Sequence, residues 1–213
     1  MRYLATFFVL TITLNLSSAH AASLQNGSFE QGVFAPPQQD TQTLGVGSDT
    51  ITGWTVSADL VAWIGASNPW QLYASDGSKY LDLTDYQLTA PFGGIEQSVM
   101  TEVGKTYELS FDLGSSLSYG LPTALIASAD ATSQEFVAQN TTENDFWETF
   151  SLIFTATDTS TLVSFVGSQG SGYIGLDNVT LNQVAAVPLP AGWILLLAGV
   201  AVPLGLRRSG ALS

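Results

Sequence analysis

Residues 106–113 read Thr106-Tyr107-Glu108-Leu109-Ser110-Phe111-Asp112-Leu113, with an apolar side chain at every second position. A period of two is typical of a β-strand that buries one face. The segment follows Val103-Gly104-Lys105, which has the composition of a turn. The same alternation returns later in the chain, after Trp147, at Phe150, Leu152, Phe154 and Ala156. These two segments predict β-strands that each bury one face.

Shorter apolar runs lie on both sides of these segments, separated by turns rich in Gly, Ser and Asp. No run shows the period of 3.6 that a helix requires. Eight or so short strands between such turns predict an all-β fold, a β-sandwich. The stretch Val33–Thr50 has no alternation, and we expect it to be a long loop over one end or face of the sandwich. The shorter runs are Leu60–Ile64, Lys79–Leu83, Ile95–Val99, Ala124–Ala127, Leu162–Val166 and Ile174–Leu181.

Charged residues exclude several classes of function. The chain has 213 residues, 18 acidic and 5 basic, with one histidine and no cysteine. All 18 carboxylates lie in residues 22–184, where Lys79 and Lys105 are the basic residues, so this body carries a net charge of −16. A body without His, Cys or Arg provides no Ser-His-Asp triad and no histidine zinc site. It also lacks the basic surface that binding to nucleic acid requires.

The first 21 residues have the pattern of a secretory signal peptide. Arg2 is followed by the mostly apolar stretch Leu4–Leu16, and Ala19-His20-Ala21 provides small residues around a cleavage site. We therefore expect export and a mature chain that starts near Ala22. The predicted organisation is a signal peptide at 1–21, a β-sandwich domain at 22–184 and a C-terminal tail at 185–213.

The tail has three parts in a fixed order. Val187-Pro188-Leu189-Pro190-Ala191 precedes the apolar run Gly192–Leu206, and Arg207 and Arg208 follow it. As a helix, the 16 residues from 191 to 206 would be about 24 Å long, which is short for a membrane core of about 30 Å. The arginine pair would remain on the cytoplasmic side of the inner membrane. An ordinary C-terminal anchor is the alternative interpretation.

This order of parts resembles the PEP-CTERM sorting tails of bacteria, in the VPLPA variant. The resemblance covers residues 187–208 and implies recognition by an exosortase, a transpeptidase embedded in the membrane. It further implies a protein that passes through a membrane-anchored intermediate. The protein would then be released into, or attached to, the extracellular polysaccharide matrix.

The order of short motifs in the body resembles domain-of-unknown-function family 642 and its galactose-binding-like relatives. The resemblance implies an exported jelly roll of about nine strands, with carbohydrate-binding modules as structural cousins and polysaccharide as the partner. The motifs are Asn26-Gly27-Ser28-Phe29-Glu30, Ile51-Thr52-Gly53-Trp54-Thr55-Val56, Asp76-Gly77-Ser78-Lys79-Tyr80-Leu81-Asp82-Leu83, Gly93-Gly94-Ile95-Glu96-Gln97-Ser98, Gly104-Lys105-Thr106-Tyr107-Glu108-Leu109-Ser110-Phe111, Trp147 with Phe150-Ser151, and Leu176-Asp177-Asn178-Val179.

Related sugar-binding jelly rolls imply one structural Ca²⁺ between the opening and closing strands. By this resemblance the ligands are Glu30 and Asp177, and backbone carbonyls around Ser78–Tyr80 could complete the set of oxygens that calcium requires. The alternative is a pair of solvated or hydrogen-bonded carboxylates without metal.

Paired carboxylates could also indicate a glycosidase. Asp82 with Asp85, and Asp145 with Glu148, are suggestive by spacing, but neither pair lies in a recognisable catalytic motif. We therefore expect a protein without enzymatic activity.

A loop-rich stretch around Asn68-Pro69 concentrates aromatic residues that could stack on sugar rings. Aromatic faces beside polar groups are typical of ligand sites, although ordinary loop anchors have the same composition. The charge of −16 disfavours anionic polymers, so we expect a neutral or cationic glycan. A structural matrix protein that self-associates, and a glycoside hydrolase, are the alternative functions. The candidate carbohydrate-binding residues are Trp63, Trp70, Tyr73 and Tyr86, of which Trp63 could instead belong to the core.

Overall fold

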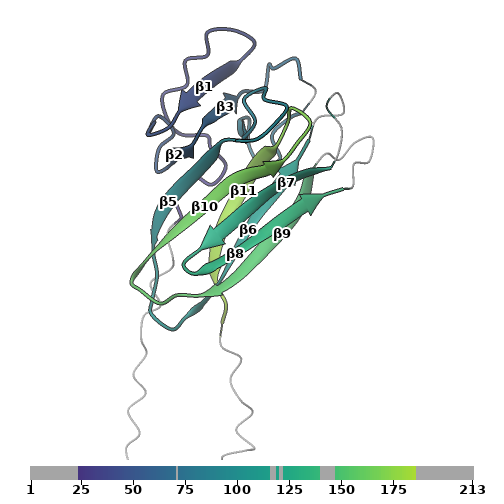
Figure 1. The fold of residues 1–213 in the computed structure, drawn as a ribbon. Helices are drawn as coiled ribbons and strands as arrows, with labels where there is room; N and C mark the ends of the chain where they lie inside the picture. Colours follow the sequence, from purple (N-terminus) through teal and green to yellow (C-terminus); the bar gives the residue numbers. More distant parts are fainter. Residues whose placement is uncertain (1–23, 71, 116–118, 120–121, 140–146, 186–213) are drawn as a thin grey trace, which may run out of the picture.

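The computed structural model describes residues 24–70, 72–115, 119, 122–139 and 147–185. In these residues eleven strands form two antiparallel sheets that pack face to face (Figure 1). The predicted all-β sandwich of jelly-roll type is thereby confirmed. The predicted signal peptide and most of the sorting tail lie outside the described residues.

One sheet has six strands and the other has five. The six-stranded sheet has the order β1 (Thr41–Gly45), β3 (Leu60–Ile64), β4 (Tyr80–Asp82), β11 (Gly175–Gln183), β6 (Thr106–Gly114) and β9 (Trp147–Thr155). The five-stranded sheet has the order β2 (Thr55–Ala58), β5 (Gly94–Met100), β10 (Ser160–Gln169), β7 (Thr123–Ala129) and β8 (Thr132–Ala138).

The main core lies between the two sheets and follows the alternation of the sequence. On β6, Tyr107, Leu109 and Phe111 are all fully buried. The β9 partners in register with them are Phe154, Leu152 and Phe150. Because strand side chains point alternately to the two faces, one face of β6 and one face of β9 supply side chains to this core.

The prediction of a long loop over Val33–Thr50 is wrong for the middle of this stretch, which forms a strand. Residues 41–45 form β1, the edge strand beside β3, in a register that runs from Thr41 opposite Ile64 to Gly45 opposite Leu60. Only Thr41 and Leu44 are buried in this strand. The strand is therefore defined by backbone pairing and not by a buried apolar face, so it leaves no alternating pattern in the sequence.

Strands β2 and β8 were also missed in the sequence. Each lies at an edge of the five-stranded sheet, and at least half of its residues are polar. In β8 the buried hydrophobic side chains are Phe136 and Ala138. Two inward residues are too few to distinguish a strand from a turn by periodicity.

The described chain ends just after β11, at the end of the sandwich opposite to β1 and β3 (Figure 1). None of the described residues belongs to a helix of sufficient length and apolar character to cross a membrane.

Candidate functional site

A second hydrophobic cluster lies on the outer face of the six-stranded sheet, near β3 and β4. On β3, Val61 and Trp63 join the main core, whereas Ala62 and Ile64 belong to the second cluster. The loop between β3 and β4 covers this face and contributes Leu72. The other members are Tyr80 and Tyr173, with Trp70, Ala74, Tyr119 and Trp147 packed against them at its edge.

Trp63 is not part of a sugar-binding surface, and this part of the prediction is wrong. Its side chain is 0% exposed. The indole Nε1 donates a hydrogen bond of 3.0 Å to the carbonyl of Phe29, and the ring of Phe34 packs edge-on at 4.9 Å. The residue lies on the inward side of β3, where alternation directs the side chain between the sheets. No sugar can reach it.

Trp70 and Tyr86 come together as predicted candidates, although 16 residues separate them. Their ring centroids are 5.4 Å apart at an interplanar angle of 68°. Tyr119 is the third ring of the group, 6.3 Å from Trp70. Tyr86 is 43% exposed, and Trp70 and Tyr119 are half-buried. We call these three residues the aromatic platform.

The backbone that presents Tyr86 is unusual. Asp85 and Tyr86 both have positive φ, at 43° and 69°. Two successive non-glycine residues in this region are uncommon, and such conformations concentrate at sites where function constrains the chain. A turn in which the N–H of Gln87 donates to the carbonyl of Thr84 holds them in place.

Tyr73 lies apart from the platform. It is 60% exposed, and no ring contact joins it to another aromatic residue among the described residues. Its backbone carbonyl accepts a hydrogen bond of 2.8 Å from Nε1 of Trp147. The structure therefore gathers two of the four predicted aromatic residues, buries one and leaves one separate.

Sequence reasoning missed Tyr119 and Tyr173. Their rings stack at 5.5 Å with an interplanar angle of 29°. Beneath them, Tyr173 and Tyr80 share a very short hydrogen bond between their hydroxyl groups. Tyr119 and Tyr173 belong to Gly- and Ser-rich loops far from Trp70 in sequence, so no local pattern predicted that they would meet.

Asp82, one member of a suggestive carboxylate pair, is a structural group. It is 1% exposed, and its Oδ1 accepts hydrogen bonds from the N–H groups of Thr84 and Ile174, both at 2.9 Å. Burial raises the pKa of Asp82 to about 7, although these hydrogen bonds oppose the shift. Its hydrogen bonds fasten two loops to the end of β4 and leave it buried away from any substrate. Asp145, from the second pair, lies outside the described residues.

Glu30 and Asp177 hold the loop before β4, and they do so through N–H and O–H donors. Glu30 accepts from the backbone N–H groups of Ser78 and Lys79, both at 2.6 Å, and from the Lys79 ammonium at 3.1 Å. Asp177 is 0% exposed, and it accepts from the N–H groups of Ser75 and Asp76 at 2.8 and 3.0 Å.

These donors do not fit a calcium site. Ca²⁺ requires several oxygen ligands, and a neighbouring ammonium group would repel it. Among the described residues no group of three acidic or histidine side chains could hold a metal ion. The calcium site stays a prediction, and the proposals below do not involve it.

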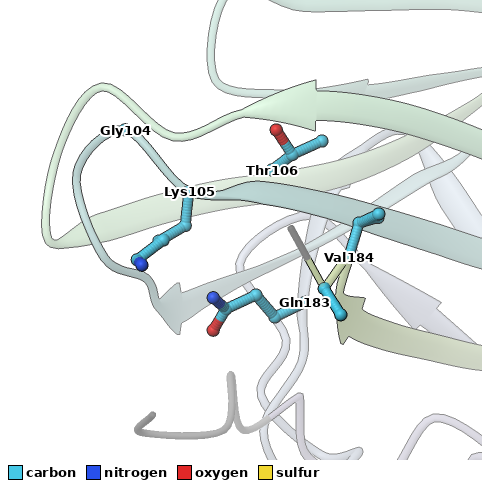
Figure 2. A pocket seen from close by; sticks show the side chains of 6 residues that line it. Gly104, Lys105, Thr106, Gln183 and Val184 are labelled. Atoms are coloured by element: carbon cyan, nitrogen blue, oxygen red, sulfur yellow. The ribbon is translucent and has the colours of Figure 1, made fainter. Parts of the chain in front are cut away.

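A separate pocket of about 330 Å³ lies at the opposite end of the sandwich (Figure 2). Its lining comes from the turn before β6 and from the end of β11, and the side chains of Lys105 and Gln183 flank it. None of the lining residues is aromatic, so the pocket offers no ring on which a sugar could stack. The lining residues are Gly104, Lys105, Thr106, Gln183, Val184 and Ala185.

Two antiparallel sheets with an aromatic platform on the outer face of one of them define a jelly-roll module of the β-sandwich class. Within this class, the chain belongs to the family described as "Protein of unknown function (DUF642)", whose family model matches residues 22–180. The family expected from the order of motifs is thereby confirmed. No curated protein matches the chain.

Solved structures of carbohydrate-binding modules are similar in fold. One, described as "CBM4 structure and function", is 20% identical with a TM-score of 0.45, and the match covers 76% of this chain and 100% of that chain. A family 61 module in complex with β-1,4-galactotriose is also 20% identical, with a TM-score of 0.44 and coverage of 76% and 97%. The xylan-binding CBM22-1 domain from Paenibacillus barcinonensis is 17% identical, with a TM-score of 0.45 and coverage of 72% and 100%.

Proposed function

We propose that residues 22–184 form a non-catalytic glycan-binding module in which the aromatic platform stacks on sugar rings. The observation that carries this proposal is the contact of Trp70 with Tyr86 and Tyr119 at the surface, on three separate loops. Sugar rings bind to aromatic faces through their apolar C–H groups, and nearby polar groups orient them.

The surroundings of the platform supply such polar groups. Thr43 and Asp85 meet beside Tyr86, where the threonine hydroxyl donates to the carboxylate at 2.8 Å. Lys79, which precedes β4, forms an ion pair with Glu30. A few stacking contacts give weak binding, with a dissociation constant on the order of 0.1–1 mM. Useful affinity would come from many copies on one polymer.

Affinity electrophoresis against a panel of polysaccharides tests this function. We expect Trp70→Ala and Tyr86→Ala to abolish the retardation that the unchanged protein shows. Ile153→Ala is the matched control, because Ile153 is 61% exposed on β9, away from the platform. Full binding by both platform variants, or equal losses in the control, would reject the site. Retardation by no glycan would reject the function.

We further propose that the protein is exported and sorted to the bacterial surface or matrix. The signal-peptide pattern of residues 1–21 and the three-part tail support this proposal. An exosortase would cut at or near Pro190 and remove the arginine pair. Mass spectrometry of the exported protein provides the test, and a mature form that retains Arg207 and Arg208 contradicts it.

A further inference from the structure

Two carboxylates are bound at the residues on either side of Tyr86 in the chain. Asp85 precedes it in the chain and is bound by Thr43, and Asp59, from the junction of β2 and β3, accepts a hydrogen bond of 3.3 Å from Nε2 of Gln87. Burial raises the pKa of Asp85, and the negative charge of Asp59 adds to this shift.

This pair of charges is not neutralised by the described part of the chain. Residues 24–185 contain Lys79 and Lys105 as their basic residues. Lys79 is bound to Glu30, and Lys105 lines the pocket at the opposite end of the sandwich. Among the described residues, Oδ2 of Asp85 and Oδ1 of Asp59 accept no hydrogen bond.

A ligand that fits here combines an apolar ring face with a positive charge. The ring face would stack on Tyr86, the most exposed ring of the platform, and the charge would lie near the two carboxylates. An ammonium group suits this position, because it donates up to three hydrogen bonds and is also attracted to aromatic faces. A neutral sugar would stack equally well but would leave the carboxylates without a counter-charge.

We propose that the glycan bound at the aromatic platform carries free amino groups, as in a polymer of glucosamine that is not fully N-acetylated. This inference rests on the proposed glycan-binding function and specifies its ligand class. The ammonium of one sugar lies between Asp59 and Asp85 while its ring stacks on Tyr86. The net charge of −16 on the body adds a long-range attraction for such a polycation.

The test compares a glucosamine hexamer with an N-acetylglucosamine hexamer, by calorimetric titration at about pH 6, where the amines are protonated and exposed carboxylates are ionised. We expect the glucosamine hexamer to bind about tenfold more tightly at low salt. We expect Asp85→Asn to remove most of this difference, because it weakens the binding of the glucosamine hexamer far more than that of the acetylated hexamer. Asp59→Asn should act in the same direction.

Glu135→Gln is the matched control. It removes one negative charge from the exposed outer side of β8, in the other sheet. Equal binding of the two hexamers, or equal losses in Asp85→Asn and Glu135→Gln, would overturn the proposal. If only acetylated or neutral glycans bind, and Trp70→Ala abolishes that binding, the amine preference is wrong while the proposed function stands. If no glycan binds, both fail.

Discussion

Asp82 and Asp177 are buried carboxylates, and among the described residues no cation forms an ion pair with either of them. Each is held by backbone N–H donors, and for each the pKa is raised to about 7, mainly by burial. In the unfolded chain their pKa returns to about 3.8. Between these values the folded state binds more protons than the unfolded state, so stability falls as the pH rises from about 4 to about 7.

We therefore expect the protein to melt at a higher temperature at pH 5 than at pH 8, by roughly 5–10 °C. Glu30 acts in the opposite direction, because hydrogen bonds lower its pKa despite burial, but its effect is confined to pH values below about 4.5. Asp82→Asn should reduce the difference clearly, whereas Glu135→Gln should leave it almost unchanged. Thermal melts at constant ionic strength measure it, and a higher melting temperature at pH 8 would refute the assignment.

Trp63 and Trp70 are close in sequence and have opposite roles. Trp63 is fully buried, and its indole N–H is bound to Phe29, whereas Trp70 lies at the edge of the second cluster. We expect Trp63→Ala to lower the free energy of unfolding by about 3–5 kcal/mol, as truncation of a buried aromatic does. Trp70→Ala should cost clearly less stability and should abolish glycan binding. Urea denaturation and binding assays on both variants separate the roles, and the opposite order of stabilities would contradict them.

At the scale of strands and loops, the strands with an apolar residue at every second position were predictable, and the edge strands β1, β2 and β8, which lack this pattern, were not. β6 and β9 carry apolar residues at alternate positions, such as Leu109 and Phe111 on β6 and Leu152 and Phe154 on β9, so the period of two identifies them. β1 has only two buried residues in five, and backbone pairing defines it. The burial of Trp63 was also not predictable, because aromatic composition alone does not tell which face of a strand a residue occupies.

The aromatic platform shows why the site was only partly predictable. Trp70 and Tyr86 stand near recognisable turn residues, but Tyr119 reaches them from the connection between β6 and β7. That meeting depends on the strand order β4-β11-β6, which brings distant loops to one end of the sheet. Sequence periodicity identifies strands, but it does not fix their order.

Glu30 holds the loop before β4 through hydrogen bonds to Ser78 and Lys79. These contacts give a prediction about the stability of the protein and about Ca²⁺. We expect Glu30→Gln to lower the free energy of unfolding by about 1–3 kcal/mol, because it weakens hydrogen bonds to Ser78 and the ion pair with Lys79. Millimolar Ca²⁺ or a chelator should not change the melting temperature of the unchanged protein. A calcium-dependent rise that Glu30→Gln abolishes would show that the carboxylate binds the ion after all.

In the whole molecule, the aromatic platform and the end of the described chain lie at opposite ends of the sandwich. The described chain ends beside Gly104 and Lys105, whereas the platform lies near β3 and β4 at the other end (Figure 1). A protein tethered through its C-terminal tail would therefore present the platform away from the tether. This arrangement suits a module that binds polymer in the surrounding matrix while its tail is held.

Because the chain contains no cysteine, one introduced cysteine can attach the protein to a bead at a chosen position, and this makes the orientation testable. Leu88 is 70% exposed, and it lies beside the platform, since both Leu88 and Tyr119 approach Gly172. Val103 is 61% exposed and precedes Gly104 at the opposite end.

We expect beads loaded through Val103→Cys to capture glycan as well as protein in solution does. Beads loaded through Leu88→Cys should capture at least about tenfold less glycan, because the linker and the bead surface exclude a polymer from the platform. Both variants are compared before coupling, so that any loss caused by the substitution itself is measured. Capture that is weaker from Val103→Cys than from Leu88→Cys would place the binding surface at the tail end of the sandwich, beside the pocket of Lys105 and Gln183.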